Sequence, residues 1–238
     1  PVIIGGTSGR GVVAACSYEA RAYGVGSAMS MKMAKQLCPE AVVIRGNSAA
    51  YSKQSKIVSA IAEESLPVIE KTSIDEFYAD LSGMDRFFGS QKVASDLRQR
   101  IMRESGLPIS FGLSANKTVS KVATGEAKPN NEKYIQSGSE KLFLSPLSIR
   151  KIPMVGPKTY QTLRDLGIQT IGTLQGMPVN ALNSVFGKHG RVIWEKAQGI
   201  DDTPVYKTSE RKSISTERTF NHDTTDLDKL RSTLMAMI

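Results

Sequence analysis

The apolar positions of this chain form short runs typical of strands and longer stretches with the spacing of helices. Residues 1–4 and 11–16 are apolar runs on either side of a glycine-rich segment, which predicts two strands joined by a tight turn. No Gly-Lys-Ser/Thr follows these glycines, so we predict no phosphate-binding loop there. Residues 48–66 form the longest amphipathic segment and predict a helix that ends before Pro67.

The rest of the first 145 residues alternates between the two patterns. Predicted helices cover 29–37, 93–103 and 114–128, and predicted strands cover 41–44, 109–113 and two segments around a turn within 68–81. We expect Ser114 to cap the last of these helices and Pro129 to end it. This order of elements predicts an α+β domain with an antiparallel sheet.

After about residue 145, short helical segments alternate with turns marked by Gly and Pro. The predicted helices cover 146–152, 157–166, 171–174, 179–186 and 190–198. Helices this short bury little surface alone, so we expect them to pack as an all-helical domain. A polar linker is expected over 201–212. The strand expected over 212–220 and the helix expected over 227–238 are too small to fold alone, so we expect the chain to be a fragment.

Composition excludes several classes of protein. The chain has 238 residues and a net charge of +8, which suits one large domain or two to three small ones. Its two cysteines, Cys16 and Cys38, cannot form a disulfide framework, and we expect both to be reduced thiols. No apolar run approaches the roughly 18 residues of a membrane span, and no basic leader precedes the first apolar residues. These features predict a cytoplasmic protein with no membrane partner.

The positive charge is concentrated in one stretch of the chain. Residues 112–191 hold 11 Lys and Arg against 4 Asp and Glu, an excess of 11 − 4 = +7. A clustered basic surface favours a polyanion, because each neutralised phosphate releases condensed counterions. A merely solvated basic face is the alternative.

Asp75 and Glu76 are adjacent carboxylates between two apolar segments. Successive side chains on a strand point to opposite faces, so the two can act together only if the chain turns near Ile74 and Asp75. Carboxylates suit Mg²⁺, which keeps waters and substrate phosphates as further ligands, and two such ions can assist phosphoryl transfer. Asp75 and Glu76 are therefore candidate catalytic and metal-binding residues, although a solvated turn is the commoner meaning of such a pair.

Two further groups suggest phosphate recognition. Lys117, Lys121 and Lys128 are predicted to share one stripe of the helix over 114–128, and a lysine at its end can face a triphosphate. Tyr18 and Arg21 are predicted on one side of a helical turn, where they can donate hydrogen bonds to phosphate oxygens. Each group alone is also typical of an ordinary exposed helical face.

The segment from Ile152 to Lys158 predicts a helix-hairpin-helix turn. Pro157 is placed at the first position of a helix, where proline is preferred, and Val155 and Gly156 precede it. Backbone N–H groups at such a helix start can bind a phosphate without reading bases. Val155, Gly156 and Lys158 are therefore candidate DNA-binding residues, together with Lys117 and Lys121.

These motifs together resemble the Y-family DNA polymerases, most closely the DinB branch. The resemblance covers essentially the whole chain and rests on five segments in family order: Arg10–Val13 with Ser17–Arg21, Ser73–Glu76, Gly112–Lys117 with Ala127–Asn130, Val155–Lys158, and Ser213–Glu217. It implies an α+β fold with an antiparallel-sheet palm, small α/β fingers, a helix-hairpin-helix thumb and a truncated little finger. The implied bounds are 1–9 and 68–145 for the palm, 10–67 for the fingers, 146–200 for the thumb, 201–208 for a linker and 209–238 for the start of the little finger.

The resemblance also implies a chemistry. Asp75 and Glu76 would bind two Mg²⁺ ions (or Mn²⁺), and Tyr18, Arg21 and Lys128 would hold the incoming dNTP. The reaction would be attack of a primer 3′-hydroxyl on the α-phosphorus of a dNTP, directed by primer–template DNA, in translesion synthesis past damaged bases. A monomer that binds the sliding clamp through a C-terminal tail outside this chain would be expected.

Some family features are absent from the sequence. The first metal-ligating Asp and the aromatic residue that excludes ribonucleotides would lie upstream of Pro1, so the resemblance implies that these 238 residues alone are inactive. Ala15 stands where many relatives have a phosphate-binding threonine. Three alternatives stay open: a non-catalytic helix-hairpin-helix DNA-binding protein, another palm-type enzyme such as a nucleotide cyclase, and the UmuC-like branch of the same family.

Overall fold

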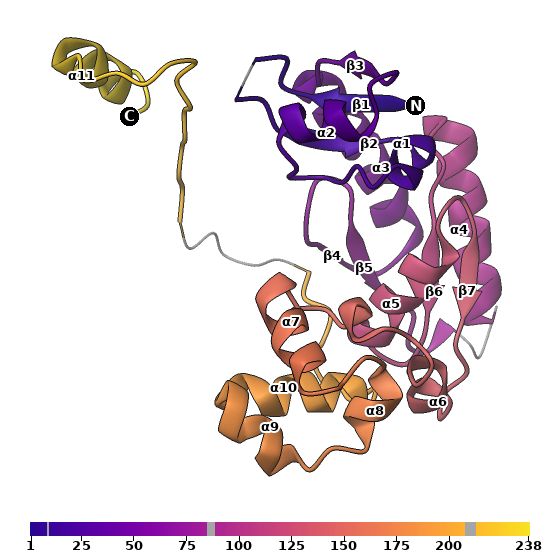
Figure 1. Ribbon diagram of the computed structural model, residues 1–238. Coiled ribbons are helices and arrows are strands. Elements are labelled where there is room, and N and C mark those ends of the chain that lie inside the picture. The colour runs from indigo at the N-terminus through magenta and orange to yellow at the C-terminus, as the bar shows by residue number, and fades with distance from the viewer. Residues whose placement is uncertain (9, 85–88, 208–212) are drawn as a thin grey trace. The chain divides into compact units, whose positions relative to one another are not determined.

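A computed structural model describes residues 1–8, 10–84, 89–207 and 213–238 (Figure 1). The chain divides into two compact units. Unit 1 comprises Pro1–Tyr51 and Glu210–Ile238, and unit 2 comprises Ser52–Ser209. The finer division into palm, fingers, thumb, linker and little finger stays a prediction.

Unit 1 contains a three-stranded sheet in the order β2-β1-β3. Its strands are β1 (Val2–Gly5), β2 (Val13–Cys16) and β3 (Val42–Ile44), and its first helices are α1 (Tyr18–Ala22) and α2 (Met31–Leu37). β1 pairs antiparallel with β2 and parallel with β3. Buried side chains of Ile3, Val13 and Met31 form its core. Here β1, assigned to the palm by the sequence resemblance, pairs with strands of the predicted fingers.

The second part of unit 1 ends in α11 (Leu227–Met235), which has no buried residue. The strand predicted over 212–220 is wrong for residues 213–220, which form no strand, and residue 212 lies outside the described part of the chain. Ile214 is 85% exposed. A strand needs a partner for its backbone groups, and the alternating Ser213–Thr216 pattern does not supply one.

Unit 2 combines two small sheets with long helices. β4 (Val68–Lys71) and β5 (Phe77–Asp80) are antiparallel, whereas β6 (Phe111–Leu113) and β7 (Glu132–Tyr134) are parallel. The helices are α3 (Ser48–Ser65), which begins in unit 1, α4 (Ser90–Ser105) and α5 (Lys117–Ala127). The α+β class is confirmed, but antiparallel pairing holds only for β1–β2 and β4–β5 among the strand pairs of the described residues.

The first core of unit 2 packs α3 and α4 on the β4–β5 hairpin. Apolar residues one to two turns apart on each helix face this core, as the amphipathic spacing predicts. Its buried members are Ile61, Ala62, Leu66, Ile69, Leu97 and Ile101. Burial of this face fixes the β4–β5 hairpin against α3.

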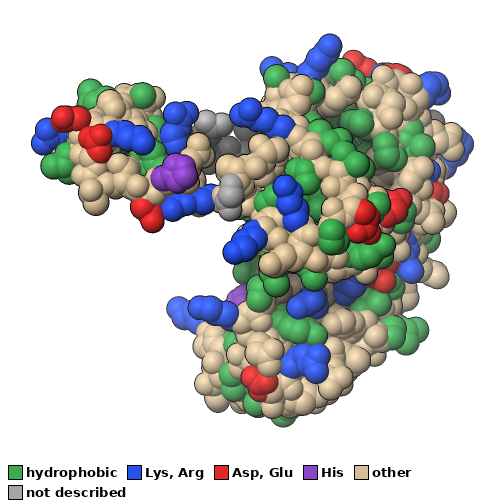
Figure 2. All heavy atoms as spheres, turned by 45° about the horizontal axis from the view of Figure 1, so that its top comes forward, with side chains coloured by type: hydrophobic (Ala, Val, Ile, Leu, Met, Phe, Trp, Pro, Cys, Tyr) green, Lys and Arg blue, Asp and Glu red, His purple; other side chains and the backbone are tan. Residues whose placement is uncertain are grey.

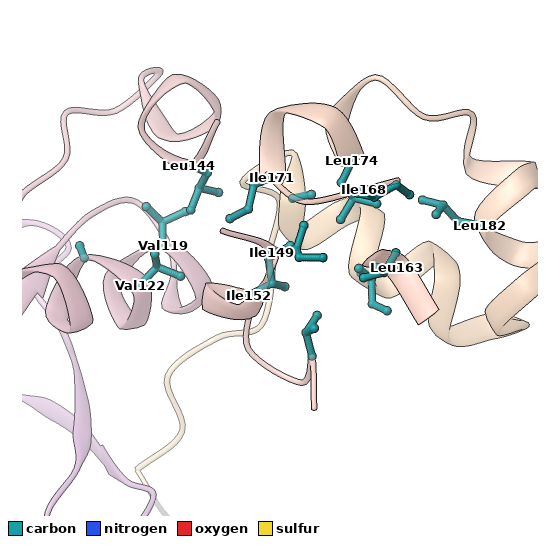
Figure 3. Packing of buried hydrophobic residues seen from close by; sticks show 14 of the residues in the cluster. Val119, Val122, Leu144, Ile149, Ile152, Leu163, Ile168, Ile171, Leu174 and Leu182 are labelled. Atoms are coloured by element: carbon teal, nitrogen blue, oxygen red, sulfur yellow. The ribbon is translucent and has the colours of Figure 1, made fainter. Parts of the chain in front are cut away.

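The second core of unit 2 joins α5 to a group of short helices. These helices are α6 (Glu140–Leu144), the 3₁₀ helix η2 (Ile149–Lys151), α7 (Pro157–Asp165), α8 (Ile171–Gln175), α9 (Val179–Phe186) and α10 (Lys188–Ala197). Figure 3 shows Val119 and Val122 of α5 on one side of this core and Leu163, Leu174 and Leu182 among the helices that follow. The helix predicted over 146–152 is reduced to the single 3₁₀ turn of η2.

Helix α5 begins later than the sequence predicts. The N-cap is Asn116, whose side chain accepts a hydrogen bond from the Val119 N–H, whereas the Ser114 hydroxyl donates to the Asn116 carbonyl. Gly112 lies directly under this helix, and a Cβ there would stand 2.4 Å from the Ser120 carbonyl oxygen. Glycine at this position therefore permits the close packing of β6 against α5.

Basic side chains are spread across the face shown in Figure 2 and are not confined to one patch. No helix within the described ranges is both long enough and apolar enough to span a membrane.

Candidate active site

The two candidate catalytic acids lie in the turn between β4 and β5. We call residues 72–76 the acidic bend. The backbone N–H groups of Thr72 and Ser73 donate to the Glu76 carbonyl at 3.1 and 3.3 Å, which closes the bend before β5 begins. Asp75 and Glu76 are both exposed. The expected turn is present, so neither carboxylate is constrained to alternate faces of a strand.

Ser73 organises the acidic bend from within. Its hydroxyl donates to Asp75 Oδ1 at 2.6 Å, and its Oγ accepts from the backbone N–H groups of Asp75 and Glu76 at 3.3 and 3.0 Å. This is the local side-chain to backbone bonding that favours serine in turns. The other oxygen of the Asp75 carboxylate accepts no hydrogen bond from the residues that the structure describes.

Glu76 is held from helix α5. Lys121 Nζ donates to Glu76 Oε2 at 2.7 Å, and this hydrogen bond raises the pKa of Lys121. The Lys121 ammonium group thus lies on a candidate metal ligand, and its predicted DNA-binding role stays a prediction. The pair is close to half exposed on both sides, so it can exchange for other partners at small cost.

Lys128 does not share a helical stripe with the other lysines, because α5 ends at Ala127. Its own backbone is extended, with φ −70° and ψ 144°, and its side chain is exposed. The expectation of one stripe is therefore wrong for Lys128. Its nucleotide-binding role stays a prediction.

Lys117 lies in a largely buried ion pair. Its side chain is 11% exposed, its Nζ donates to Glu70 Oε2, and the rings of Tyr78 and Tyr206 lie 5.4 and 5.5 Å away. Burial alone would raise the pKa of Glu70, but hydrogen bonds from Lys117 and from the Tyr206 N–H lower it overall. The Lys117 charge is thus already balanced, and a contact to DNA phosphate would require breaking this pair.

Tyr18 and Arg21 lie on one side of α1, as predicted. Ser17 caps this helix by accepting from the Ala20 N–H, and the Arg21 guanidinium lies 5.8 Å from the centre of the Tyr18 ring. Tyr18 is 53% exposed. These two residues belong to unit 1, whereas Asp75, Glu76 and Lys128 belong to unit 2. A common cavity for the five side chains stays a prediction.

The predicted hairpin turn precedes α7. Val155 is buried in the second core, and its N–H donates to the Ile152 carbonyl, while its DNA-binding role stays a prediction. Gly156 is the N-cap of α7 with an ordinary φ of −79°, and a Cβ built there would meet nothing within 4 Å. Neither backbone strain nor packing within the described chain requires glycine here, which leaves room for a ligand at the exposed helix start beside Lys158.

A buried aspartate that the sequence did not single out lies at the other end of α5. Asp201 Oδ2 accepts from the Thr118 hydroxyl at 2.6 Å, from the Thr118 N–H at 3.1 Å and from Lys196 Nζ at 3.4 Å. Burial would raise the pKa of Asp201, but the hydrogen bonds from Thr118 and Thr203 and the charge of Lys196 lower it to about 2. We call these three groups, Thr118, Lys196 and Asp201, the Asp201 joint.

The donor set of the acidic bend suits a magnesium ion. Asp75 and Glu76 offer exposed carboxylate oxygens, and Mg²⁺ takes one or two carboxylates together with waters and substrate phosphates. The described residues contain no group of three or more His, Cys, Asp or Glu side chains that could hold a metal ion. An ion held by the two carboxylates of the bend would take its further ligands from waters and substrate phosphates.

Comparison with protein families gives two matches. Residues 1–125 match the model described as the impB/mucB/samB family, and residues 150–201 match the model described as the DNA polymerase-iota thumb domain. The second match begins within η2 and ends at Asp201.

Individual relatives agree with these matches. DNA polymerase IV of Dehalococcoides mccartyi strain BAV1 is 42% identical over 94% of this chain, and DNA polymerase IV of Halorhodospira halophila is 38% identical over all of it. The chain spans 58% and 67% of the length of these two proteins.

Solved structures show the same likeness. A DinB structure from Sulfolobus solfataricus has a TM-score of 0.78 and 28% sequence identity to this chain. The match covers 87% of this chain and 62% of the DinB chain. An insertion ternary complex of Dbh DNA polymerase has a TM-score of 0.75 and 28% sequence identity to this chain. The match covers 86% of this chain and 61% of the Dbh chain. The family resemblance inferred from the sequence is confirmed.

Proposed function

Because the chain belongs to the impB/mucB/samB family of Y-family DNA polymerases, we propose that the acidic bend is the catalytic centre of a template-directed DNA polymerase active in translesion synthesis. The observation that carries this proposal is the geometry of the bend. It presents two exposed carboxylates side by side, one fixed by Ser73 and the other by Lys121. Contacts like those of Ser73 are common in ordinary turns. The bond from Lys121 of α5 comes from outside the bend, and a solvated turn does not require it.

Asp75 and Glu76 would hold the divalent metal, which we propose to be a pair of Mg²⁺ ions, with Mn²⁺ as a substitute. When bound, such ions neutralise charge on the transferred phosphoryl group and favour ionisation of the attacking hydroxyl. The protein residues supply position. Ser73 orients the Asp75 carboxylate, and the Glu76 carboxylate exchanges its bond to Lys121 for a place beside the primer 3′-hydroxyl.

We propose that Tyr18, Arg21 and Lys128 bind the triphosphate of the incoming dNTP. The exposed Tyr18 hydroxyl and the Arg21 guanidinium come from the same turn of α1, which suits two neighbouring phosphate oxygens. The exposed ammonium group of Lys128 would be a third hydrogen-bond donor to the triphosphate, and it carries a positive charge. When the new phosphodiester bond forms, pyrophosphate would be released as the leaving group, and these three residues would still contact it.

The start of α7 would bind the backbone of primer–template DNA. The first N–H groups of a helix have no partner within the helix, and Gly156 leaves open space beside them. Lys158 on the first turn adds charge. Contacts of this kind position the duplex without reading its bases, as a polymerase that acts on many sequences requires. A monomeric state and binding to the sliding clamp are part of the same proposal.

Primer extension with Mg²⁺ and all four dNTPs tests the proposal, in a protein that carries this chain at the full length of its relatives. Asp75→Asn is expected to lower the extension rate about a thousandfold, because a catalytic metal contributes several kcal/mol to transition-state stabilisation. Asp202→Asn, also an exposed Asp→Asn change in the same unit, is the matched control and is expected to keep the wild-type rate.

The alternatives give different results. Undiminished extension by Asp75→Asn, with DNA binding retained, would favour a non-catalytic DNA-binding role for the bend. Nucleotide turnover that is indifferent to primer–template DNA would favour a cyclase-like enzyme.

A further inference from the structure

The acidic bend is not held in place by apolar burial. Ile74, the apolar residue at its tip, is 52% exposed, and both acids beside it are exposed. A five-residue turn of this kind samples several conformations unless its backbone groups are tied down. Beyond its own internal bonds and the packing of the flanking strands, its position therefore depends on hydrogen bonds to neighbouring elements.

A side chain of helix α3 donates a hydrogen bond to the backbone of the acidic bend. Ser55, a buried residue of α3, donates its hydroxyl hydrogen to the Ile74 carbonyl oxygen at 2.5 Å. That carbonyl belongs to the peptide whose N–H is the Asp75 N–H, so the contact fixes the peptide plane from which the Asp75 side chain projects. The Asp75 N–H in turn donates to Ser73 Oγ, and Ser73 donates to the Asp75 carboxylate.

Lys71 supports the Ser55 hydroxyl. It is the last residue of β4, and its Nζ donates to Ser55 Oγ at 2.7 Å and to Ser59 Oγ at 2.9 Å. Ser55 and Ser59 lie four residues apart on one face of α3, so a single ammonium group reaches both. With Lys71 donating to its oxygen, the Ser55 hydroxyl can direct its only hydrogen to Ile74. A charged donor also polarises the hydroxyl and strengthens the bond that follows.

We propose that Lys71 and Ser55 are positioning residues for the catalytic carboxylate Asp75, acting through the Ile74 carbonyl group. This inference rests on the proposed function of the bend. Their hydrogen bonds go to Ile74, to Ser59 and to each other, and they would not themselves bind the substrate or the metal. Their effect is to hold the bend in the conformation that binds metal. The conformational entropy of ordering the bend is then lost during folding and does not weaken metal binding.

The test measures how primer extension depends on Mg²⁺ concentration, in a protein that carries this chain at the full length of its relatives. Lys71→Met is expected to raise the half-saturating Mg²⁺ concentration about tenfold, the effect of losing one charge-assisted hydrogen bond. Ser55→Ala is expected to act in the same direction. Lys71→Arg, whose guanidinium can donate to both serines, is expected to restore most of the wild-type Mg²⁺ dependence.

The matched control is Lys56→Met, which removes an exposed lysine from the same helix. It is expected to leave the half-saturating Mg²⁺ concentration unchanged. Affinity for primer–template DNA is expected to stay within about twofold for all of these variants. A loss of stability alone would lower the amount of active protein without changing its Mg²⁺ dependence, so the readout separates positioning from a structural role.

The possible outcomes are distinct. A wild-type Mg²⁺ dependence in both Lys71→Met and Ser55→Ala overturns the positioning role while leaving the polymerase proposal intact, provided that Asp75→Asn is inactive. If Asp75→Asn stays active, the proposed function fails. Direct titration of Mn²⁺ into the same variants then decides whether Lys71 still tunes metal binding at the bend, and equal affinities of Lys71→Met and wild type would reject it. Should Lys71→Met fail to fold, Ser55→Ala carries the same comparison.

Discussion

Asp75 and Asp201 are the same residue type in the same unit, yet their surroundings assign them opposite tasks. The Asp201 side chain is 8% exposed, and its carboxylate accepts hydrogen bonds from Thr118, Lys196 and Thr203. Asp75 is exposed and receives one side-chain hydrogen bond, from Ser73. A carboxylate that the protein saturates holds the fold together, whereas one that is oriented but left open is available to a ligand.

The same contrast separates the two lysines of α5. Lys117 is enclosed by Glu70, Tyr78 and Tyr206, whereas Lys121 makes an exposed bond to Glu76. The two side chains differ by one helical turn and were indistinguishable in the sequence. Their depth in the structure decides which one can take part in binding.

The largest expected effect on stability is at the Asp201 joint. Asp201→Ala is expected to lower the free energy of unfolding by about 2–4 kcal/mol, because it leaves the N–H and hydroxyl of Thr118 without their acceptor and the largely buried charge of Lys196 without its counter-ion. Asp75→Ala is expected to change it by no more than about 0.5 kcal/mol, since Asp75 is exposed. Urea unfolding of the two variants makes the comparison. Equal losses would show that the contrast in burial has no energetic meaning.

The second prediction concerns pH. The pKa of Asp201 is about 2 in the folded protein and 3.8 ordinarily, so its ionised form stabilises the fold above pH 3.8. This contribution is lost as the pH falls from 3.8 through about 2. The difference in stability between wild type and Asp201→Ala is therefore expected to be largest at pH 5 and to shrink across that interval. A difference that stays constant from pH 5 to pH 2.5 would contradict the assigned contacts.

A smaller effect is expected at Lys121. If Glu76 binds the metal as proposed, Lys121 and the ion compete for its carboxylate, so Lys121→Met is expected to lower the half-saturating Mg²⁺ concentration. The shift should not exceed about fivefold, since an exposed ion pair contributes up to about 1 kcal/mol. Lys92→Met, which breaks another exposed pair, is the control for general charge effects. A rise in the required Mg²⁺ would instead mean that Lys121 supports the metal-bound state.

The smallest effect is expected at Asp96. Its carboxylate lies 2.5 Å from Lys92, closer than any contact of Asp201, but both side chains are well exposed. Asp96→Asn is expected to change the free energy of unfolding by less than about 0.5 kcal/mol and to leave primer extension unaltered. A cost comparable to that of Asp201→Ala would show that short distance, and not burial, sets the strength of these pairs.

Local sequence signals predicted much of this fold. Pro157 marked the start of α7, the Gly and Pro turns marked the short helices after residue 145, and the residues around Ile74 marked the bend between β4 and β5. These features depend on neighbours within a few positions, which the sequence displays directly. The two acids of the bend could be singled out for the same reason.

The features that were missed depend on distant partners. Asp201 lies 83 residues from Thr118, and nothing around Asp201 distinguishes it from an ordinary polar linker residue. Ser55 and Lys71 are unremarkable in sequence and acquire meaning only when α3 packs on the hairpin. The strand expected near Ile214 failed for the converse reason, since its pattern was suitable but no partner strand is present in the described residues.

The contact between Thr118 and Asp201 closes a long loop in the chain. Such closure loses more conformational entropy than the formation of a local helix, so this contact is expected to form after α5 and the helices that follow it. The amide hydrogen of Thr118 is donated directly to Asp201 and is inaccessible while the loop stays shut. The rate at which this hydrogen exchanges with deuterium from the solvent therefore reports how often the short helices after α5 separate from the part of unit 2 that carries Asp75 and Glu76.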